Sequence, residues 1–396
     1  MDITKSIMHK RNHYNNTPNR LVIDLLVMER HKSYGFQEYI LNLLGYFHRH
    51  REDVLFDKIV IICKRGEESL FAEYSRLFDI VSYPYQSYLK RLWIQTMFPI
   101  WLKLKEHDVL LSPGNYTGLI KRCPTVLVIH DLLYKRKGLL KNRMMRYQRE
   151  LFVPYSIRNA DKVIAISKYT ADDIRHYYPW VGDKICVVHN YLDFLKFSTT
   201  PSTSKGLYLL AVSSNQYHKN LHTLIRAYGM YADVGGELPL LLVGVLDETT
   251  PAGKVYEQLP EPTRKRVIFR ADISNEELGK LYQNAACYVS ASLFEGLGMP
   301  IAEAMYFNLP VLISDGKVFR EVSLGRGRYF NPLNADELCK LLLGVDGDKC
   351  NYSKDIITMF SEEKTSAKYV DIINNSATGG GNIDDAAALY NQRRAA

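Results

Sequence analysis

Residues 287–315, CYVSASLFEGLGMPIAEAMYFNLPVLISD, read as a strand, a loop, a helix and a second strand. The first and last runs are apolar and β-prone, and the loop at residues 292–299 holds an acid and two glycines. Pro300 suits the first turn of a helix, because its missing N–H would have no partner there. Asn308 tolerates the left-handed backbone at which helices end. The stretch therefore predicts a β-loop-α-β unit of an α/β protein.

Two carboxylates of this unit, Glu295 and Glu303, are separated by seven residues. Glu295 lies in the loop, and Glu303 is expected in the first turn of the helix, where free backbone N–H groups attract negative charge. These N–H groups, with the backbone of Gly296, Leu297 and Gly298, offer a cradle for a phosphate group, since glycine lets a ligand come close. A phosphate cradle between two acceptors suits a nucleotide sugar. The alternative is a plain βαβ connection whose glycines serve only its turns.

Residues 295–311, EGLGMPIAEAMYFNLPV, resemble the E-x7-E signature of the retaining GT-B glycosyltransferases of family 4, also called glycosyl transferases group 1. The usual form is E-G-F-G-L-P-x-x-E-A-M-A-x-G-x-P-V. Leu297 and Met299 replace Phe and Leu and stay apolar, whereas Asn308 replaces Gly and keeps the helix-ending role. The resemblance covers roughly residues 21–374. It implies two Rossmann-like domains that face each other across a cleft, with a C-terminal helix that crosses back to the first domain.

Length and composition fit this size of protein. The chain has 396 residues, enough for two domains that each bury a core. Hydrophobic residues make up 46% and charged residues 24%, as in an ordinary globular protein. The net charge of +8 suits an anionic substrate or an anionic membrane surface, and we expect no nucleic-acid partner. The six cysteines include no C-x-x-C pair and no zinc spacing, which favours a reducing compartment.

The sequence predicts a cytoplasmic protein. Its first twenty residues are polar and lack the apolar segment of a signal peptide, and no apolar run reaches the roughly 20 residues that a spanning helix needs. Two basic segments, residues 88–105 and 135–149, allow peripheral contact with an anionic membrane. The alternatives are a helix packed on the sheet for the first segment and a solvated basic face for the second.

The first half opens as a Rossmann unit. A strand at residues 21–28, a turn with Gly35 and a helix from Gln37 follow one another. The strand Thr125–Ile129 then delivers His130 at its C-terminal end, where open α/β sheets bind ligands. The resemblance implies that Gly35 faces the donor phosphates. It also implies that His130 reaches the transferred sugar and holds a hydroxyl group or developing charge, rather than acting as a general base. Taken alone, each is more often a structural residue.

The pattern restarts after residues 198–205, a Ser/Thr/Pro-rich segment that is the best linker candidate. A strand at residues 207–212 is followed by His218-Lys219-Asn220 and a helix, which resembles the family's R-K-N element. The resemblance implies that Lys219 binds the donor diphosphate, a role that suits a lysine as a point charge. His218 replaces the usual Arg, and a neutral His would weaken this clamp. The alternative is that Lys219 is a solvated lysine.

These boundaries predict the domain organisation. We expect a flexible lead-in (1–20), an N-terminal Rossmann-like acceptor-side domain (21–197), the linker (198–205), a C-terminal Rossmann-like nucleotide-sugar domain (206–360), a crossover helix (361–375) and a flexible tail (376–396).

The resemblance implies a retaining hexosyltransferase. It would move a sugar from a nucleoside-diphosphate sugar to a hydroxyl group of a glycan or lipid-linked glycan, by analogy in surface polysaccharide (O-antigen or capsule type) biosynthesis. The implied catalytic residues are His130 and Glu295, and the implied donor-binding residues are Gly35, Lys219, Gly296, Leu297, Gly298 and Glu303, with Glu303 on the ribose. We expect no cofactor and no metal, because the cleft loops hold no Asp-x-Asp and a lysine and helix dipoles already oppose the phosphate charge. Alternatives are a nucleotide-sugar hydrolase or epimerase on the same fold, and a basic binding module without chemistry.

Overall fold

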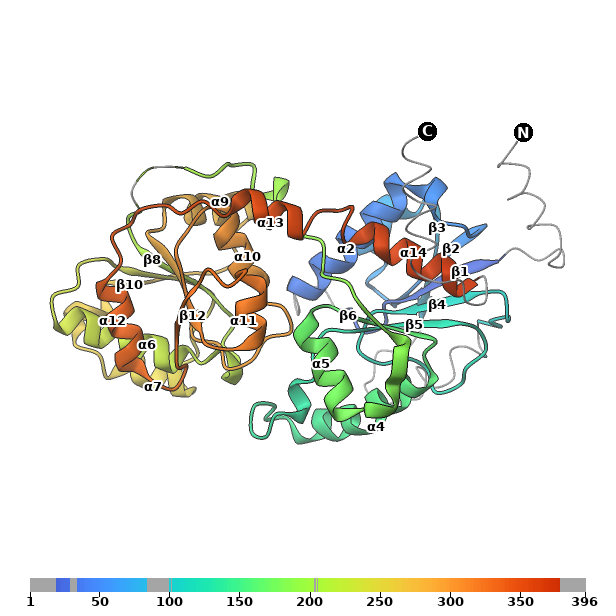
Figure 1. The fold of residues 1–396 in the computed structure, drawn as a ribbon, viewed down its shortest axis with the longest axis horizontal. Coiled ribbons are helices and arrows are strands. Elements are labelled where there is room, and N and C mark those ends of the chain that lie inside the picture. Colours follow the sequence, from blue (N-terminus) through green and yellow to red (C-terminus); the bar gives the residue numbers. More distant parts are fainter. Residues whose placement is uncertain are drawn as a thin grey trace.

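The computed structural model describes residues 19–28, 34–83, 100, 102–202, 204 and 206–377. They form two domains side by side, each built around a sheet of parallel strands (Figure 1). The first sheet has the strand order β3-β2-β1-β4-β5-β6-β7, and the second has the order β10-β9-β8-β11-β12-β13. In both sheets the first strand lies in the interior and the winding reverses beside it, as in a doubly wound Rossmann sheet. The expected fold class is confirmed.

The first domain is built from short apolar strands and three main helices. These elements are β1 (Arg20–Asp24), α2 (Tyr34–Arg49), β2 (Lys58–Lys64), β3 (Phe78–Tyr83), β4 (Val109–Ser112), β5 (Thr125–Ile129), α4 (Arg143–Asn159), β6 (Lys162–Ala165), α5 (Lys168–Tyr177) and β7 (Ile185–Val187). The strands β4 and β5 are buried along their whole length. Parallel strands covered on both faces have this continuous apolar character.

The second domain repeats the arrangement with six strands. Its elements are β8 (Leu209–Val212), α6 (Leu221–Asp233), β9 (Leu240–Val243), α7 (Pro251–Glu257), α8 (Glu261–Arg264), β10 (Val267–Arg270), α9 (Asn275–Asn284), β11 (Cys287–Ser290), α10 (Met299–Tyr306), β12 (Val311–Ser314), α11 (Lys317–Val322), β13 (Arg328–Phe330) and α12 (Ala335–Leu343). Asn308, just after α10, has the left-handed φ of 59° that its place in the sequence predicts. Its side chain accepts hydrogen bonds from the backbone N–H groups of Tyr352 and Ser353 (2.7 and 2.9 Å), a contact that glycine could not make.

The last described helix lies on the first domain, as expected. After α13 (Ser353–Met359) the last described helix, α14 (Ser366–Ala377), lies against the first domain (Figure 1). The Asn374 side chain accepts a hydrogen bond from the N–H of Leu55 (3.1 Å) and donates one to the carbonyl of Asp53 (2.8 Å). Tyr369 packs its ring against Tyr39 of α2 with centroids 5.8 Å apart. The crossover helix therefore begins at Ser366, five residues later than predicted.

Other local expectations differ from the structure. The sequence around residues 67–78 predicts a helix, but the structure has a 3₁₀ segment there, η2 (Glu68–Tyr74). The edge strand β3 follows, and its exposed polar residues hide the strand pattern. Gly35 lies inside the first turn of α2 rather than in the preceding turn. The basic segment at residues 88–105 falls largely outside the described residues.

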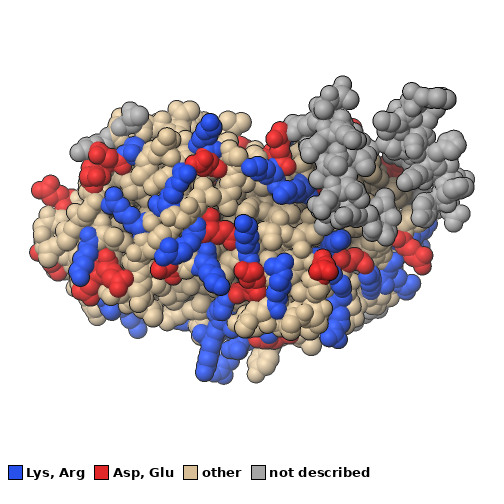
Figure 2. Space-filling view, in the orientation of Figure 1, with Lys and Arg blue, Asp and Glu red and all other residues tan. Residues whose placement is uncertain are grey.

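Charged residues of both signs are mixed on the surface: Lys and Arg are interspersed with Asp and Glu over the face in Figure 2. Among the described residues, no helix has the length and apolar character needed to cross a bilayer.

We expect Asp371→Asn to raise the thermal unfolding midpoint more at pH 8 than at pH 5. Burial on α14, together with nearby Asp53, raises the pKa of the Asp371 carboxyl group to about 6. The folded state therefore binds this proton more tightly than the unfolded state does, so the carboxylate costs stability above pH 6 and the cost fades as the pH falls. We expect the carboxylate to cost about 1 kcal/mol of stability at pH 8. A pKa shift of one unit corresponds to about 1.4 kcal/mol, and solvent screening reduces this value for a partly exposed group.

Thermal unfolding at both pH values checks this expectation. Asp183→Asn, which removes an exposed carboxylate of the first domain, is the control. Equal midpoint gains for Asp371→Asn at pH 5 and pH 8 would contradict it.

Candidate functional site

Lys219 and Glu295 form an ion pair at the edge of the second sheet. Lys219 ends η6 (Tyr217–Lys219), after β8, and Glu295 lies in the loop after β11. The Lys219 Nζ is 2.7 and 3.0 Å from the two carboxylate oxygens of Glu295. Because β8 and β11 are neighbouring parallel strands, their C-terminal ends meet at one edge. Both side chains are largely shielded, at 20% and 15% exposure, which strengthens their interaction.

The turn that carries Lys219 is held by Asn220. This residue is buried and has a left-handed backbone with φ 54°, which asparagine tolerates better than most side chains. Its amide donates hydrogen bonds to the carbonyl groups of Ala291 (2.9 Å) and Pro332 (2.7 Å). His218, one residue earlier than Lys219, is also buried, and burial together with Lys219 lowers the pKa of its ring. His218 is therefore neutral and does not replace the charge of an arginine.

Gly296 lies where the two domains touch. A Cβ atom there would lie 2.1 Å from the carbonyl oxygen of His130, so no larger residue fits without movement. The Gly296 carbonyl accepts hydrogen bonds from the hydroxyl groups of Ser167 (2.7 Å) and Thr170 (3.3 Å) of the first domain. Gly298 has φ 87° and precedes the first residue of α10. The glycines thus serve a close domain contact and a helix start.

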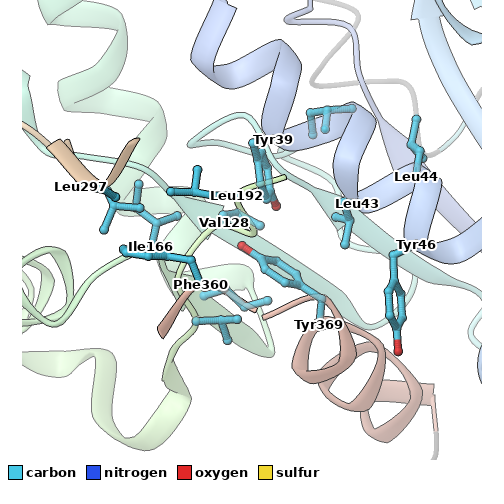
Figure 3. Packing of buried hydrophobic residues seen from close by; sticks show 14 of the residues in the cluster. Tyr39, Leu43, Leu44, Tyr46, Val128, Ile166, Leu192, Leu297, Phe360 and Tyr369 are labelled. Atoms are coloured by element: carbon cyan, nitrogen blue, oxygen red, sulfur yellow. The ribbon is translucent and has the colours of Figure 1, made fainter. Parts of the chain in front are cut away.

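Leu297 inserts between the domains. It is 3% exposed and belongs to a hydrophobic cluster that includes Val128 and Ile166 of the first domain. Figure 3 shows Leu297 beside Ile166, with Leu192 and Phe360 completing the same layer. An apolar residue at this position of the loop therefore joins the two domains as well as shaping the loop.

His130 is fixed by the first domain. Its Nε2 lies 2.8 Å from the carbonyl oxygen of Pro113, and its backbone N–H donates to Asn115 Oδ1 (2.6 Å). The ring packs edge-on against Phe36 and Tyr39, each with centroids 5.2 Å away. Since a carbonyl oxygen only accepts, Nε2 carries the proton and Nδ1 is left as an acceptor. Burial lowers the pKa of the ring, so the imidazole is neutral at pH 7.

We expect the activity to show no loss from His130 protonation as the pH falls from 8 to 7. The pKa of this ring is lowered by burial, so the ring stays mainly neutral in this range. The check is the pH dependence of kcat/KM for wild type and for His130→Asn. A wild-type decline with an apparent pKa near 6.5 that the variant lacks would contradict a neutral histidine.

Glu303 lies in the second turn of α10, not in the first. The helix starts at Met299, one residue before Pro300, because Gly298 takes the position ahead of the helix. Glu303 is 5% exposed and accepts a hydrogen bond from the hydroxyl group of Tyr282 (2.9 Å). It is stabilised by these side-chain contacts rather than by the free N–H groups of the helix start.

Lys196 links Glu303 to the first domain. It lies in η5 (Leu195–Phe197), with Nζ 2.8 Å from the Glu303 Oε1 atom, and it also forms an ion pair with Glu38 of α2. Burial alone lowers the pKa of Lys196, but the two carboxylates outweigh it and the pKa is raised, so the ammonium group stays charged. The pKa of Glu38 is raised, chiefly by burial. No spacing in the sequence links Lys196, Glu38 or Tyr282 to the signature, so their contacts with one another are visible only in the structure.

Gly35 approaches the same loop from the first domain. A Cβ atom on Gly35 would meet the end of the Met299 side chain at 2.6 Å. The N-terminal turn of α2, which carries Gly35, therefore faces the N-terminal turn of α10. The predicted residues of both domains thus lie at one junction between the domains. Lys219 and Glu303, the two predicted donor-binding side chains, have different partners: Lys219 contacts Glu295, and Glu303 contacts Lys196.

A further contact between the domains comes from Glu321 of α11. Its carboxylate accepts hydrogen bonds from the backbone N–H groups of Lys168 (2.8 Å) and Tyr169 (3.0 Å) at the start of α5. The His189 Nε2 atom lies 2.9 Å from the same carboxylate. Burial pushes the pKa of Glu321 upward, but these hydrogen bonds outweigh it and the pKa is lowered. This residue fastens the two domains beside the site.

Two recesses differ in their relation to the site. One of about 150 Å³ lies beside η6 and is lined by Asn215, Gln216, Tyr217 and the start of α7, with Lys141 reaching over from the first domain. The Lys141 Nζ lies 4.2 Å from the ring centroid of Tyr217. The other, of about 320 Å³, lies at the amino ends of β1 and β2, opposite the edge at which such sheets bind ligands. Among the described residues, no group of three or more His, Cys, Asp or Glu side chains is placed to hold a metal ion.

Two family models match adjoining parts of the chain. The model described as Glycosyltransferase Family 4 matches residues 35–194, and the one described as Glycosyl transferases group 1 matches residues 195–342. Among curated proteins, the O-antigen chain mannosyltransferase RfbU of Salmonella typhimurium is 28% identical over 265 residues, which is 64% of this chain and 71% of that protein. The alpha-1,3/1,6-mannosyltransferase ALG2 of Dictyostelium discoideum is 23% identical over 351 residues, 76% of this chain and 78% of that protein.

Solved structures share the fold. Anabaena HepE in complex with UDP superposes with a TM-score of 0.65 at 15% identity, covering 91% of this chain and 100% of that one. The lipopolysaccharide outer core galactosyltransferase WaaB superposes with a TM-score of 0.62 at 18% identity, covering 90% and 98%. This chain therefore has the same overall fold as these proteins.

Proposed function

Since the chain belongs to the family 4 glycosyltransferases, we propose that it transfers a hexose from a nucleoside-diphosphate sugar to a hydroxyl group of a glycan acceptor, with retention of configuration. The observation that carries the proposal is the Lys219–Glu295 pair at the C-terminal ends of β8 and β11. A shielded ammonium group there can stabilise the negative charge that develops on a leaving diphosphate. In our proposal Glu295 orients Lys219 and lies beside the donor sugar.

The other roles follow from position. The backbone of residues 296–298 and the first turn of α2 with Gly35 lie on opposite sides of the junction and would hold the diphosphate. His130, neutral and with Nδ1 as an acceptor, would receive a hydrogen bond from a sugar hydroxyl group. Glu303 would bind the ribose hydroxyl groups after exchanging the contact with Lys196.

We propose mannose as the transferred sugar and a surface polysaccharide precursor as the acceptor. RfbU is an O-antigen chain mannosyltransferase, and ALG2 is also a mannosyltransferase. These names support the choice of sugar and pathway class. The test compares donors with different nucleotides, because HepE, which shares the fold, was solved with UDP and with UDP-glucose.

A nucleotide-sugar panel tests the proposal. GDP-mannose, UDP-glucose, UDP-galactose and dTDP-rhamnose are compared by thermal shift, and the donor that stabilises the protein is then incubated with a lipid-linked glycan acceptor. The expected result is a mannosylated product. Free sugar without acceptor product would favour a hydrolase, and a changed nucleotide sugar would favour an epimerase. Salt-sensitive polyanion binding without a thermal shift for any donor would favour a binding module.

We expect Glu303→Ala to weaken donor binding by about ten- to a hundredfold, because a hydrogen bond to a charged group is worth about 1.5–3 kcal/mol. The remaining Lys196–Glu38 pair keeps the buried ammonium group compensated. Isothermal titration with the stabilising donor measures the loss, with Glu276→Ala, an exposed carboxylate of α9, as the control. Donor affinity equal to that of wild type would remove Glu303 from the donor site.

A further inference from the structure

The outer face of α4 is apolar where a surface helix is normally polar. Four side chains on it are strongly exposed: Met144 (70%), Tyr147 (75%), Leu151 (68%) and Tyr155 (42%). Other exposed apolar residues, such as Leu195 and Leu333, occur singly in short segments or turns. Scattered exposed residues are normal, but a row of four on one helix is not.

The row is continuous along the helix. At 100° per residue, positions 144, 147, 151, 155 and 158 fall within an arc of roughly 80°. The buried side chains of α4, Phe152, Val153, Ser156 and Ile157, fall on the opposite side. The row is therefore directed away from the buried side of α4, over a length of about 17 Å from Met144 to Tyr155.

Positive charge surrounds this row. Lys137, Lys141, Arg143 and Arg146 are exposed at its N-terminal end, and Arg158 is exposed at its C-terminal end. No salt bridge joins these five to a carboxylate within the described part of the chain, whereas nearby Glu150 is paired with Lys135. Figure 2 shows Lys and Arg side chains projecting at the lower edge of the molecule, in the region where Figure 1 places the segment ahead of α4.

An exposed aromatic residue, Trp180, lies at the C-terminal end of the row. The Trp180 ring, 43% exposed, lies beside the end of α4, with the Arg158 guanidinium group 4.9 Å from its centroid. Tyr and Trp favour the boundary between lipid headgroups and acyl chains, where one end of the ring is wet and the other apolar. Lys and Arg on either side of such a row meet anionic headgroups.

We propose that the outer face of α4, together with the basic segment from Lys137 that precedes it, docks the protein on an anionic lipid bilayer. The helix lies in the plane of the interface, with the apolar row in the headgroup region and the flanking cations on anionic lipids. A narrow apolar row with cations at both ends matches a membrane surface better than a protein partner, whose interface core is depleted of charge.

This docking places the site near the lipid surface. Lys141, at the N-terminal end of the row, also contacts Tyr217 beside Lys219, so the row and the domain junction are continuous. The conclusion that a lipid-linked acceptor reaches the site from this side rests on the proposed function. The docking itself does not, because it needs neither donor nor acceptor.

Vesicle co-sedimentation of the full chain, without donor or acceptor, tests the docking. Phosphatidylcholine vesicles with 30% phosphatidylglycerol are compared with phosphatidylcholine alone. Wild type should bind the anionic vesicles and release them at high salt. The double variant Tyr147→Ser/Leu151→Ser should bind at least tenfold more weakly, and Arg143→Gln/Arg158→Gln about 25-fold more weakly, from roughly fivefold per cation.

The control is Leu207→Ser/Leu333→Ser, which removes two isolated exposed leucines of the second domain and should bind as wild type does. All variants should keep the wild-type unfolding midpoint, because every substituted residue is exposed. Unchanged binding by both α4 variants, or equal binding of neutral vesicles, would overturn the proposal. So would self-association of wild type that the α4 variants lose, without vesicle binding, since the row would then face a second copy of this chain. Loss of vesicle binding with normal transfer to a water-soluble acceptor separates this proposal from the proposed function.

Discussion

Lys219→Ala should lower kcat for sugar transfer by about 10²–10³-fold while the protein stays folded. Lys219 Nζ is held within 3.0 Å of both oxygens of Glu295, at the strand ends where the diphosphate is proposed to leave. A preorganised positive group at the site of developing charge lowers the activation barrier by about 3–4 kcal/mol, and its removal raises the barrier by the same amount. The effect appears in kcat, because the charge on the leaving group is larger in the transition state than in the bound donor.

The measurement is steady-state transfer at saturating donor. Lys265→Ala removes an exposed lysine of the same domain, paired with Glu261 on the surface, and should leave kcat unchanged. Glu295 loses a shielded partner in the Lys219 variant, so the unfolding midpoint should fall, and kcat is measured well below the midpoints of both proteins. Transfer near the wild-type rate by Lys219→Ala would show that the diphosphate is stabilised elsewhere.

The sequence predicts most strands because their burial is visible locally. β5 and β9 begin and end where the sequence predicts strands, at Thr125–Ile129 and Leu240–Val243, since each run is apolar apart from Thr125 and lies between a proline and a polar or turn residue. The start of α9 was also predictable, because Ser274 and Glu277 form a capping box. The strand β3 was missed for the converse reason. It lies at the edge of its sheet, and its exposed Asp79 and Ser82 interrupt the apolar run.

The helix after His130 shows how periodicity alone misplaces a boundary. The basic segment at residues 135–149 has helical spacing, but α4 begins only at Arg143. The Asn142 side chain accepts the N–H of Met145 (3.0 Å) and starts the helix there, and Gly138 has φ 81° in the preceding turn. The same helix continues through Asn159, because its buried face packs on the first sheet.

The candidate site was predictable where neighbouring strands of one domain build it. Lys219 and Glu295 come from β8 and β11, and strand order brings them together. The contacts of Lys196 with Glu303 and Glu38 depend instead on how the two domains are placed. No periodicity or spacing within a segment encodes that placement, so these residues become visible only in three dimensions.

We expect Lys196→Met to destabilise the protein by about 3–5 kcal/mol at pH 7.5. Lys196 is 10% exposed and separates two carboxylates, Glu38 of the first domain and Glu303 of the second. Without the ammonium group, the buried Glu303 carboxylate and the partly exposed Glu38 carboxylate lose their shared cation, and removing one partner of a buried ion pair has a cost of this size. Methionine keeps the length of the side chain, so lost packing contributes little.

The pH dependence identifies the cause. Burial already raises the pKa of Glu38, and loss of the neighbouring cation removes the interaction that opposes this rise. A carboxyl group with a raised pKa binds its proton more tightly in the folded state, so the deficit of Lys196→Met should shrink as the pH falls from 7.5 toward 5. A deficit that is constant with pH would indicate lost packing instead of unpaired charge.

Combining substitutions separates charge from structure. Glu38→Gln leaves Lys196 and Glu303 as a one-to-one pair, and it should change stability by less than about 1 kcal/mol, since it replaces one acceptor by another of the same shape. The double variant Lys196→Met/Glu38→Gln leaves a single carboxylate that keeps its hydrogen bond from Tyr282. It should therefore be more stable than Lys196→Met alone, although it carries one substitution more. Additive losses in this cycle would mean that the three side chains do not interact. The two domains would then be held together by the contacts of Gly296 and Glu321, and not through Glu303.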